Sequence, residues 1–420
     1  MTQPARPRPR QGLPLLEDLG PVRGRRVLVR TDFNVPLGDD GDGNRIVVDD
    51  FRIRAALPTL EWLLAEGADV TACSHLGNPP GVWDAALTMA PVRDRLADLC
   101  PGVSLMENLR FSPGEKADDP AFVASLVDGF DAYVNDAFGV AHRRHASVVG
   151  PPTRLPSAAG RRLAEEVEVL GCLLDEPPRP FVAVVGGAKV ADKLGVLETL
   201  AGKVDVLAVG GAMAFTFLVA LGRDVGGSMV DLDRVEDCRR LLDAGTRVLL
   251  PTDVVALEPG GSFGAPCGEP GPRGDTKVVG TDLPDGWLGL DIGPETAATF
   301  AEAVAGARTV LWNGPLGVVE DDRFAGGTRR VAQAVADCPG FTVVGGGDSA
   351  SALEQLGLAD RVDFLSTGGG ASLKFVECGD LPALAALRAA PNAPGSGASG
   401  AGAPTGRAPT GGGRSGAVSA

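Results

Sequence analysis

Two lysines that follow a pair of glycines point to phosphate chemistry. The segment from Phe181 to Lys193, FVAVVGGAKVADK, is an apolar run of strand type that stops at two glycines before Lys189 and Lys193. A strand, a glycine turn and a following helix present backbone N–H groups and the positive end of a helix dipole to an anion. Lysines four residues apart share one helix face, so we expect a helix that bears both, with a phosphate beside it. The alternative is an ordinary strand-to-helix joint with two solvated lysines.

Arginines recur where the predicted strands of the first half end. Strand-type segments separated by helical patterns lie at 26–37, 68–75, 103–111 and 131–136. The carboxyl ends of parallel strands share one edge of a sheet, so Arg30, Arg110 and Arg143 should converge there. Arg52, at the start of a predicted helix, should join them. Arginine binds carboxylate and phosphate bidentately, and this edge therefore predicts a small, multiply anionic ligand.

The second half repeats a strand followed by glycine. The units are FVAVVGGAK, VLAVGGAMAF, RVLLPTDVV, WLGLDIGPET, TVLWNGPLGVVE, FTVVGGGDSA and FLSTGGGAS. Glycine at a strand end lets a ligand lie against the backbone, which suits a flat base and a polyphosphate. In GGGDSA, Asp348 either caps a helix or coordinates Mg²⁺ on nucleotide phosphates. The segment also fits the dinucleotide pattern GxGxxA, but it lies far from the first βα unit, which disfavours a dehydrogenase.

Composition excludes several other classes. No apolar run approaches the roughly 18 to 20 residues of a membrane helix, and we expect a cytoplasmic protein. A net charge of -15 and a pI near 4.7 disfavour nucleic acid and anionic lipid as partners. Seven scattered cysteines without a CxxC pair indicate neither a disulfide framework nor a zinc site. The motifs GxxxxGK(S/T) and GxSxG are absent, and His75, His142 and His145 lie close to arginines, which favours hydrogen bonding to an anion over metal binding.

With these residues in place, the sequence resembles the phosphoglycerate kinase family from Leu13 to Leu387. The resemblance rests on motifs that occur in one order: RTDFNVPL, RIRAALPTL, SHLG, ENLRF, YVNDAFGVAHRRH, RPFVAVVGGAKVADK, GGAMAFTF, LDIGPET, WNGPLGVVE, GGGDSA and STGGGASL. It implies a mainly monomeric glycolytic enzyme that reversibly transfers a phosphoryl group between ATP and the carboxylate of 3-phosphoglycerate, forming ADP and 1,3-bisphosphoglycerate.

The predicted fold class is α/β, with two doubly wound, Rossmann-like parallel sheets flanking a cleft. The expected divisions are a disordered lead at 1–12, a 3-phosphoglycerate-binding domain at 13–157, an interdomain helix at 158–176, a nucleotide-binding domain at 177–372, a segment returning to the N-terminal domain at 373–390 and a disordered tail at 391–420. Pro177 and Pro178 mark the end of the interdomain helix. The Gly/Pro-rich stretch from Leu257 to Asp275 is expected to be a surface loop.

The resemblance also implies roles for individual residues. It implies substrate binding by Arg30, Asp32, Asn34, Arg52, His75, Arg110 and Arg143, with Asn78 in a further substrate-binding position. It implies nucleotide binding by Gly187, Lys189, Lys193, Gly211, Gly289, Leu290, Asn313, Pro315, Val318, Glu320, Gly346, Gly347, Asp348 and Ser349, with Glu320 on the ribose and Asp348 as the Mg²⁺ ligand. Arg52, Lys189 and Gly369 take the catalytic positions.

The implied reaction requires the enzyme to align its two substrates and does not require a covalent intermediate with the enzyme. Phosphoryl transfer between a carboxylate and a phosphate requires in-line alignment and positive charge over the equatorial oxygens, and a carboxylate needs no general base. Arg52, Lys189, Mg²⁺ and backbone amides are expected to stabilise that charge once the domains close and exclude water. Closure is expected to bend around the interdomain helix and the STGGG segment.

One departure from the family pattern bears on substrate affinity. The family has SHLGRP where this chain has SHLGNPPG, so Asn78 replaces an arginine that holds the distal phosphate of the substrate. Losing one charge-assisted contact costs about 1.5 to 3 kcal/mol, or roughly one to two orders of magnitude in affinity. We expect weaker acid binding, with compensation by Arg54 or Arg144 as one possibility. The alternative from another class is a nucleotide-binding paralog without turnover.

Overall fold

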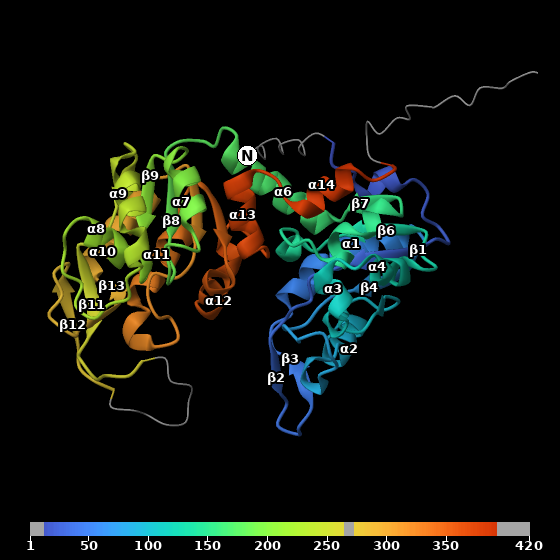
Figure 1. The fold of residues 1–420 in the computed structure, drawn as a ribbon, viewed down its shortest axis with the longest axis horizontal. Coiled ribbons are helices and arrows are strands. Elements are labelled where there is room, and N and C mark those ends of the chain that lie inside the picture. Colours follow the sequence, from blue (N-terminus) through green and yellow to red (C-terminus); the bar gives the residue numbers. More distant parts are fainter. Residues whose placement is uncertain (1–11, 264–272, 393–420) are drawn as a thin grey trace, which may run out of the picture.

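Two parallel β-sheets, each packed between helices, form the fold (Figure 1). The computed structural model describes residues 12–263 and 273–392. The expected N-terminal lead and C-terminal tail fall almost entirely outside these residues, as does the middle of the loop predicted at 257–275. The architecture is the α/β fold with two Rossmann-like sheets that the sequence predicts.

The first sheet has five parallel strands in the order β5-β4-β1-β6-β7. These strands are β1 (Arg26–Arg30), β4 (Asp69–Cys73), β5 (Ser104–Leu105), β6 (Ala132–Asn135) and β7 (Ser157–Ala159). The helices of this half are α1 (Phe51–Ala65), α2 (Ala90–Leu99), α3 (Pro113–Ala117), α4 (Pro120–Val127) and α5 (Ala146–Val149). An antiparallel hairpin of β2 (Leu37–Asp39) and β3 (Arg45–Val47) follows β1.

The second sheet has six parallel strands in the order β10-β9-β8-β14-β15-β16. These strands are β8 (Phe181–Val185), β9 (Val206–Val209), β10 (Arg247–Leu249), β14 (Thr309–Asn313), β15 (Phe341–Gly345) and β16 (Phe364–Leu365). Its helices are α7 (Leu194–Ala201), α8 (Met213–Ala220), α9 (Val235–Asp243), α10 (Pro294–Ala305), α11 (Gly326–Ala336), α12 (Gly347–Gln355) and α13 (Gly370–Cys378). Within the described residues, no helix has the length and apolar character that a membrane crossing requires.

Alternating side chains on each central strand supply two cores. In β1, Val27 and Val29 pack into a core with α1 and α2, whereas Leu28 faces the opposite side of the sheet. In β8, Val182 and Val184 pack against α10 and α11, and the residues between them face the other way. The inner faces of both sheets contribute to one apolar cluster. A strand buried on both faces reads as a continuous apolar run, which is why these strands could be predicted.

Helix α6 (Arg161–Leu174) connects the two halves through buried carboxylates. At its first turn, Asp136 from the end of β6 accepts a hydrogen bond from Leu163 N at 3.1 Å, and burial raises the pKa of the Asp136 carboxyl to about 6. Farther along, Glu166 accepts hydrogen bonds from Thr367 N at 2.6 Å and from Ser366 Oγ at 2.7 Å. The helix is thus hydrogen-bonded to both sheets.

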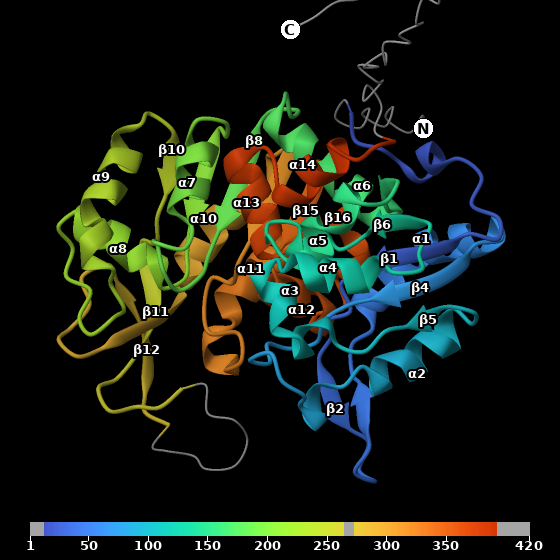
Figure 2. The same cartoon turned by 45° about the vertical axis from the view of Figure 1, so that its right-hand side comes forward.

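The chain returns to the first half after β16. Helix α14 (Pro382–Arg388) packs against α5 and β7, where Ala383 N donates to Ala141 O at 3.1 Å (Figure 2). Beyond it, Asn392 Oδ1 accepts from Ser157 N at 2.7 Å. Helix α14 lies in the segment 373–390 that was expected to return to the N-terminal domain, whereas Asn392 falls in the stretch 391–420 that was expected to be a disordered tail.

Several predicted boundaries are wrong for local reasons. The strand predicted at 26–37 ends at Arg30, because the following residues bond to the loop after β4 and not to a neighbouring strand. The helix predicted at 158–176 begins at Arg161, since residues 157–159 pair with β6 as β7. The strand predicted at 103–111 shortens to β5. The antiparallel sheet β12-β11-β13, made of β11 (Asp253–Leu257), β12 (Thr276–Gly280) and β13 (Leu288–Ile292), was not predicted as separate from the parallel sheet.

The first prediction concerns the joint before α6. A Cβ at Gly160 would lie 2.6 Å from Asp136 Cβ and would also overlap the carboxylate that caps the helix. Gly160→Ala should therefore lower the free energy of unfolding by about 1 to 3 kcal/mol, the usual cost of overpacking. Urea denaturation followed by circular dichroism measures this. Gly280→Ala, at a position with open space, is the control, and equal stabilities for the two variants would contradict the packing argument.

Candidate active site

Basic side chains meet at the carboxyl edge of the first sheet. Arg30 ends β1, His75 follows β4, Arg110 follows β5 and Arg143 follows β6. Burial lowers the pKa of Arg110, and the charges of Arg30 and Arg143 lower it further, which requires these guanidinium groups to lie near one another. The structure therefore brings together the cations that the sequence placed at separate strand ends.

Arg30 is completely buried and orients His75. Its Nε donates to Ser147 Oγ at 2.8 Å, and its Nη2 lies 3.2 Å from His75 Nδ1. A guanidinium only donates hydrogen bonds, so His75 Nδ1 must accept and the ring proton resides on Nε2. Burial, with the charge of Arg30, lowers the pKa of His75 well below its usual value, so the ring is neutral.

Asp32 connects this cluster to α1. Arg52 Nη1 donates to Asp32 Oδ2 at 2.6 Å, and the Asp32 side chain is only 7% exposed. Burial alone would raise the pKa of Asp32, but the charges of Arg52 and Arg30 hold it below its usual value. The ionised carboxylate fixes Arg52, whose side chain keeps 29% of its surface accessible.

Buried side-chain nitrogens around this edge lack hydrogen-bond partners in the described part of the protein. Arg110 Nη1 donates to Gly77 O at 2.7 Å, but among the described residues its buried Nε has no hydrogen-bond partner, and neither does His142 Nδ1. Burial, followed by the charge of Arg143, lowers the pKa of His142, and burial lowers that of His145 to about 4. Unsatisfied donors and clustered cations are the features of a site that binds an anion.

Asn78 is exposed in a loop whose backbone is fixed on both sides. Asn34 Oδ1 accepts from Gly77 N at 2.7 Å, and Pro79 O accepts from Lys116 Nζ at 2.8 Å. Arg54, one of the arginines considered for compensation, is paired with a carboxylate, since its Nε donates to Asp50 Oδ1 at 2.8 Å. The bond to Pro79 O makes Lys116 a cation that the structure holds beside the Asn78 loop, and no sequence pattern singled it out.

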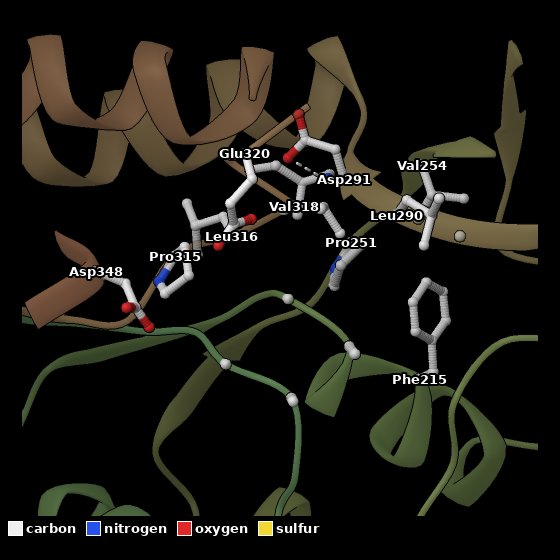
Figure 3. A pocket seen from close by; sticks show the side chains of 17 residues that line it. Phe215, Pro251, Val254, Leu290, Asp291, Pro315, Leu316, Val318, Glu320 and Asp348 are labelled. Carbon is white, nitrogen blue, oxygen red and sulfur yellow. Dashed lines mark hydrogen bonds between the residues drawn. The ribbon is translucent and has the colours of Figure 1, made fainter. Parts of the chain in front are cut away.

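A cavity of about 220 Å³ lies at the carboxyl edge of the second sheet (Figure 3). Eight residues predicted to bind nucleotide line it: Gly187, Gly211, Gly289, Leu290, Pro315, Val318, Glu320 and Asp348. Phe215, Val254 and Leu290 lie at one end, and Asp348 lies beside Pro315 at the other. Gly289 faces Phe215 so closely that a Cβ would overlap the ring. An apolar end and a polar end suit a base and its phosphates.

The two lysines do not share a helix face, contrary to the sequence-based prediction. Helix α7 begins at Leu194, after both of them, because Gly187 has a φ of +132° and a turn closes from Lys193 N to Val190 O at 2.9 Å. Lys189 is exposed. Lys193 Nζ donates to Gly186 O and to Asn313 Oδ1, the latter at 2.9 Å, and burial lowers its pKa to about 8.

Helix α12 begins beside this lysine. Gly346, with a φ of +98°, precedes α12, and Asp348 lies in its first turn. Ser349 Oγ accepts from Gly314 N at 2.7 Å, which ties the helix to the end of β14. Asn313 thus contacts Lys193 directly and Gly346 lies beside Asn313, but neither these two residues nor Gly347 and Ser349 line the cavity of about 220 Å³.

Sequence reasoning missed Asp291, on β13. Its carboxylate accepts from Gly327 N at 2.7 Å and from Ile292 N at 2.9 Å, and burial raises its pKa to about 7. Asp291 lines the cavity and holds the start of α11. Phe215 was missed as well, because an apolar residue in an apolar helix gives no signal of ligand contact.

A second cavity, of about 170 Å³, joins the two edges. Asn34 and Arg52 line it from the first half, and Gly347 and Thr367 line it from the second. The glycine loop at 368–370 lies nearby, since a Cβ at Gly370 would be 4.0 Å from His142 Nε2. The basic edge and the glycine-rich edge therefore face a common space.

Comparisons with known proteins bear on this arrangement. A family model described as phosphoglycerate kinase matches residues 16–103 and 100–379. The chain belongs to the phosphoglycerate kinase family. The phosphoglycerate kinase of Rubrobacter xylanophilus is 50% identical over 390 residues, covering 87% of this chain and 96% of the relative. That of Salinispora arenicola is 50% identical over 396 residues, with 87% and 96% covered.

Solved structures of phosphoglycerate kinases have the same fold as this chain. A phosphoglycerate kinase from Coxiella burnetii aligns with a TM-score of 0.75 and 35% identity over 87% of this chain and 97% of its own. One from Pyrococcus horikoshii aligns with a TM-score of 0.77 and 29% identity over 90% and 99%. The chain is thus a kinase, and the comparisons do not support the alternative of a paralog without turnover.

The second prediction follows from the environment of Lys193. Its pKa of about 8 means that the free enzyme loses a buried cation above that pH. The affinity for a nucleoside triphosphate, measured by isothermal titration calorimetry, should therefore fall by up to about tenfold per pH unit above pH 8. Lys193→Arg, which stays charged, should remove this fall. An unchanged affinity up to pH 10 in the wild type would show that Lys193 does not contribute its charge.

Proposed function

We propose that this kinase transfers a phosphoryl group directly and reversibly between ATP and the carboxylate of 3-phosphoglycerate. The observation that supports it most is the shared cavity, where Arg52 of the basic edge and Gly347 of the glycine-rich edge line one space. A reaction between an anionic acid and a nucleotide needs both edges to face each other. The reaction belongs to glycolysis, as it does for the family.

The basic edge is the proposed acid site. Arg110, Arg143 and His75 offer donors to the phosphate and carboxylate of 3-phosphoglycerate, with Asn34 and Asp32 holding the surrounding loops. Charge-assisted bonds to such donors are about twice as strong as neutral ones. Arg30, being completely buried, acts on the substrate through His75.

The glycine-rich edge is the proposed nucleotide site. The adenine lies between Phe215 and Leu290, with Glu320 on the ribose. The phosphates approach Lys193 and the N-terminus of α12, where backbone N–H groups and the helix dipole favour an anion. The exposed Lys189 reaches the phosphoryl group that is transferred.

Magnesium enters with the nucleotide. The described residues contain no group of three or more His, Cys, Asp or Glu that could hold a metal ion. Mg²⁺ bound to nucleotides usually takes one or two protein carboxylates and completes its shell with phosphates and water. Asp348, whose carboxylate lines the cavity, fits this requirement. The ion would neutralise phosphate charge during transfer.

Transfer itself requires alignment and charge. The carboxylate of the acid attacks the terminal phosphorus in line with the leaving oxygen, and no proton has to be removed. Arg52, fixed by Asp32, and Lys189 stabilise the equatorial oxygens, while the backbone at Gly369 lies beside them. Gly369 has a φ of +48°, and no described atom lies within 4 Å of the position that a Cβ would take. A ligand can therefore approach this backbone closely.

We further propose that the enzyme is a cytoplasmic monomer with two domains. The N-terminal domain spans 13–157, and α6 lies between it and the C-terminal domain, which begins at 177. The expected boundary at 372 falls inside α13 (Gly370–Cys378), so the C-terminal domain is extended to 378 and the segment returning to the first domain is 379–390. Closure rotates the domains about α6 and the segment that Glu166 holds.

The third prediction tests activity and the Asn78 departure together. A coupled assay of ATP-dependent 1,3-bisphosphoglycerate formation should show turnover, and Asn78→Arg should lower the KM for 3-phosphoglycerate by about tenfold or more by restoring a charge-assisted contact. The KM for ATP should not change. Absence of turnover in both proteins, with ATP still bound, would refute the kinase function.

The fourth prediction concerns closure. Small-angle scattering should give a smaller radius of gyration with both substrates bound than with either alone, because only the ternary complex joins the two edges. Arg52→Ala should reduce this compaction while leaving the substrate-free radius unchanged. A radius that is independent of ligands would contradict hinge closure.

A further inference from the structure

Glu115 is a completely buried carboxylate behind the basic edge. It lies in α3, and its two oxygens accept from one residue, Ser147: Oε1 from the hydroxyl at 2.6 Å and Oε2 from the backbone N–H at 2.9 Å. Oε1 also lies 4.0 Å from Arg30 Nη2 and 3.8 Å from His145 Nδ1. Nothing in the proposed reaction uses this carboxylate directly.

Ser147 links Glu115 to Arg30, because its hydroxyl donates to the first and accepts from the second. Because the hydroxyl proton points to Glu115, the lone pairs of Ser147 Oγ are free to accept from Arg30 Nε at 2.8 Å. Arg30 Nη2 in turn contacts His75 Nδ1 at 3.2 Å. An unbroken chain of hydrogen bonds therefore runs from Glu115 to the imidazole of His75.

The two charged residues fix which group donates and which accepts along this chain of hydrogen bonds. Arg30 and Glu115 are both 0% exposed, and an isolated buried charge is far more costly than a buried pair. The carboxylate can only accept and the guanidinium can only donate, so each intervening group has one allowed role. At the end of the chain, His75 Nδ1 must accept from Arg30, and the ring proton must therefore be on Nε2.

We propose that Glu115 and Ser147 are positioning residues for the acid substrate, which fix Arg30 so that neutral His75 presents its Nε2–H as a donor. The inference rests on the proposed function, since it takes the basic edge as the acid site. A buried carboxylate needs hydrogen-bond partners whatever its role, so the KM for the acid and the tautomer of His75, and not stability, decide whether this chain positions the substrate.

Two variants break the chain at different points. Ser147→Ala removes the hydroxyl but keeps the Glu115 and Arg30 charges. Glu115→Gln keeps the shape, but its amide replaces one of the two acceptor oxygens by an NH2 donor, so either the hydroxyl or the N–H of Ser147 loses its present acceptor. Thr342→Val is the matched control, because it also removes a buried hydroxyl that donates to a carboxylate, Asp363, at 3.0 Å, on the far side of the second sheet.

Steady-state kinetics and the tautomer of His75 are the measurements. Ser147→Ala and Glu115→Gln should each raise the KM for 3-phosphoglycerate roughly threefold to tenfold, the range of one hydrogen bond, with the KM for ATP unchanged. Nitrogen-15 NMR of the imidazole should show the Nε2–H tautomer in the wild type and in Thr342→Val. It should show a mixture of tautomers in the two variants.

The outcomes separate this inference from the proposed function. His75→Ala should raise the KM for 3-phosphoglycerate, and an unchanged KM would mean that the acid site itself is misplaced. Suppose that His75→Ala raises that KM, whereas Ser147→Ala and Glu115→Gln lower thermal stability, as the control Thr342→Val does, and leave the KM unchanged. The positioning role is then refuted. Retention of a pure Nε2–H tautomer in both variants would refute it equally.

Discussion

Hydrogen bonds of two buried carboxylates, Asp136 and Glu166, connect α6 to both halves of the molecule. Asp136 brings the end of β6 to the first turn of the helix, and Glu166 holds the residues after β16 through Ser366 and Thr367. Both contacts lie next to the strand ends that form the site. Since an unpaired buried carboxylate is costly, these bonds are expected to persist through domain motion. The proposed closure of the domains would therefore pivot around them, with the acid and nucleotide edges kept in line.

The two proposed binding edges would hold anions by different physical means. The first uses side-chain cations that are preorganised by buried partners, as Asp32 holds Arg52 and Ser147 holds Arg30. The second relies on glycines, the N-terminus of α12 and Lys193, which bonds to backbone oxygen. Side-chain donors select a compact acid by the direction of their bonds, whereas an exposed backbone admits an extended polyphosphate. The division suits a reaction whose two substrates are both anions but differ in shape.

Sequence patterns predicted the parallel sheets, the polar strand ends and eight of the residues that line the cavity of the second half, because buried strands and glycine turns leave local signals. They failed where the outcome depends on tertiary contacts. Lys189 and Lys193 were placed on a helix by spacing alone, but the turn at Gly187 delays the helix to Leu194. Asp291 could not be recognised, since a carboxylate on a strand gives no sign that it will be buried against the start of α11. The roles of Glu115 and Ser147 depend on contacts between residues that are distant in sequence.

The loop at Asn78 shows how a departure from the family pattern is to be weighed. Asn78 removes a planar guanidinium, yet Lys116 is held by Pro79 O in the same loop. An ammonium is a point charge without the paired donors of a guanidinium, so it attracts a phosphate without fixing its orientation. The residues proposed for transfer, Arg52 and Lys189, lie outside this loop. We therefore expect the substitution to weaken the binding of the acid without changing the groups proposed for transfer.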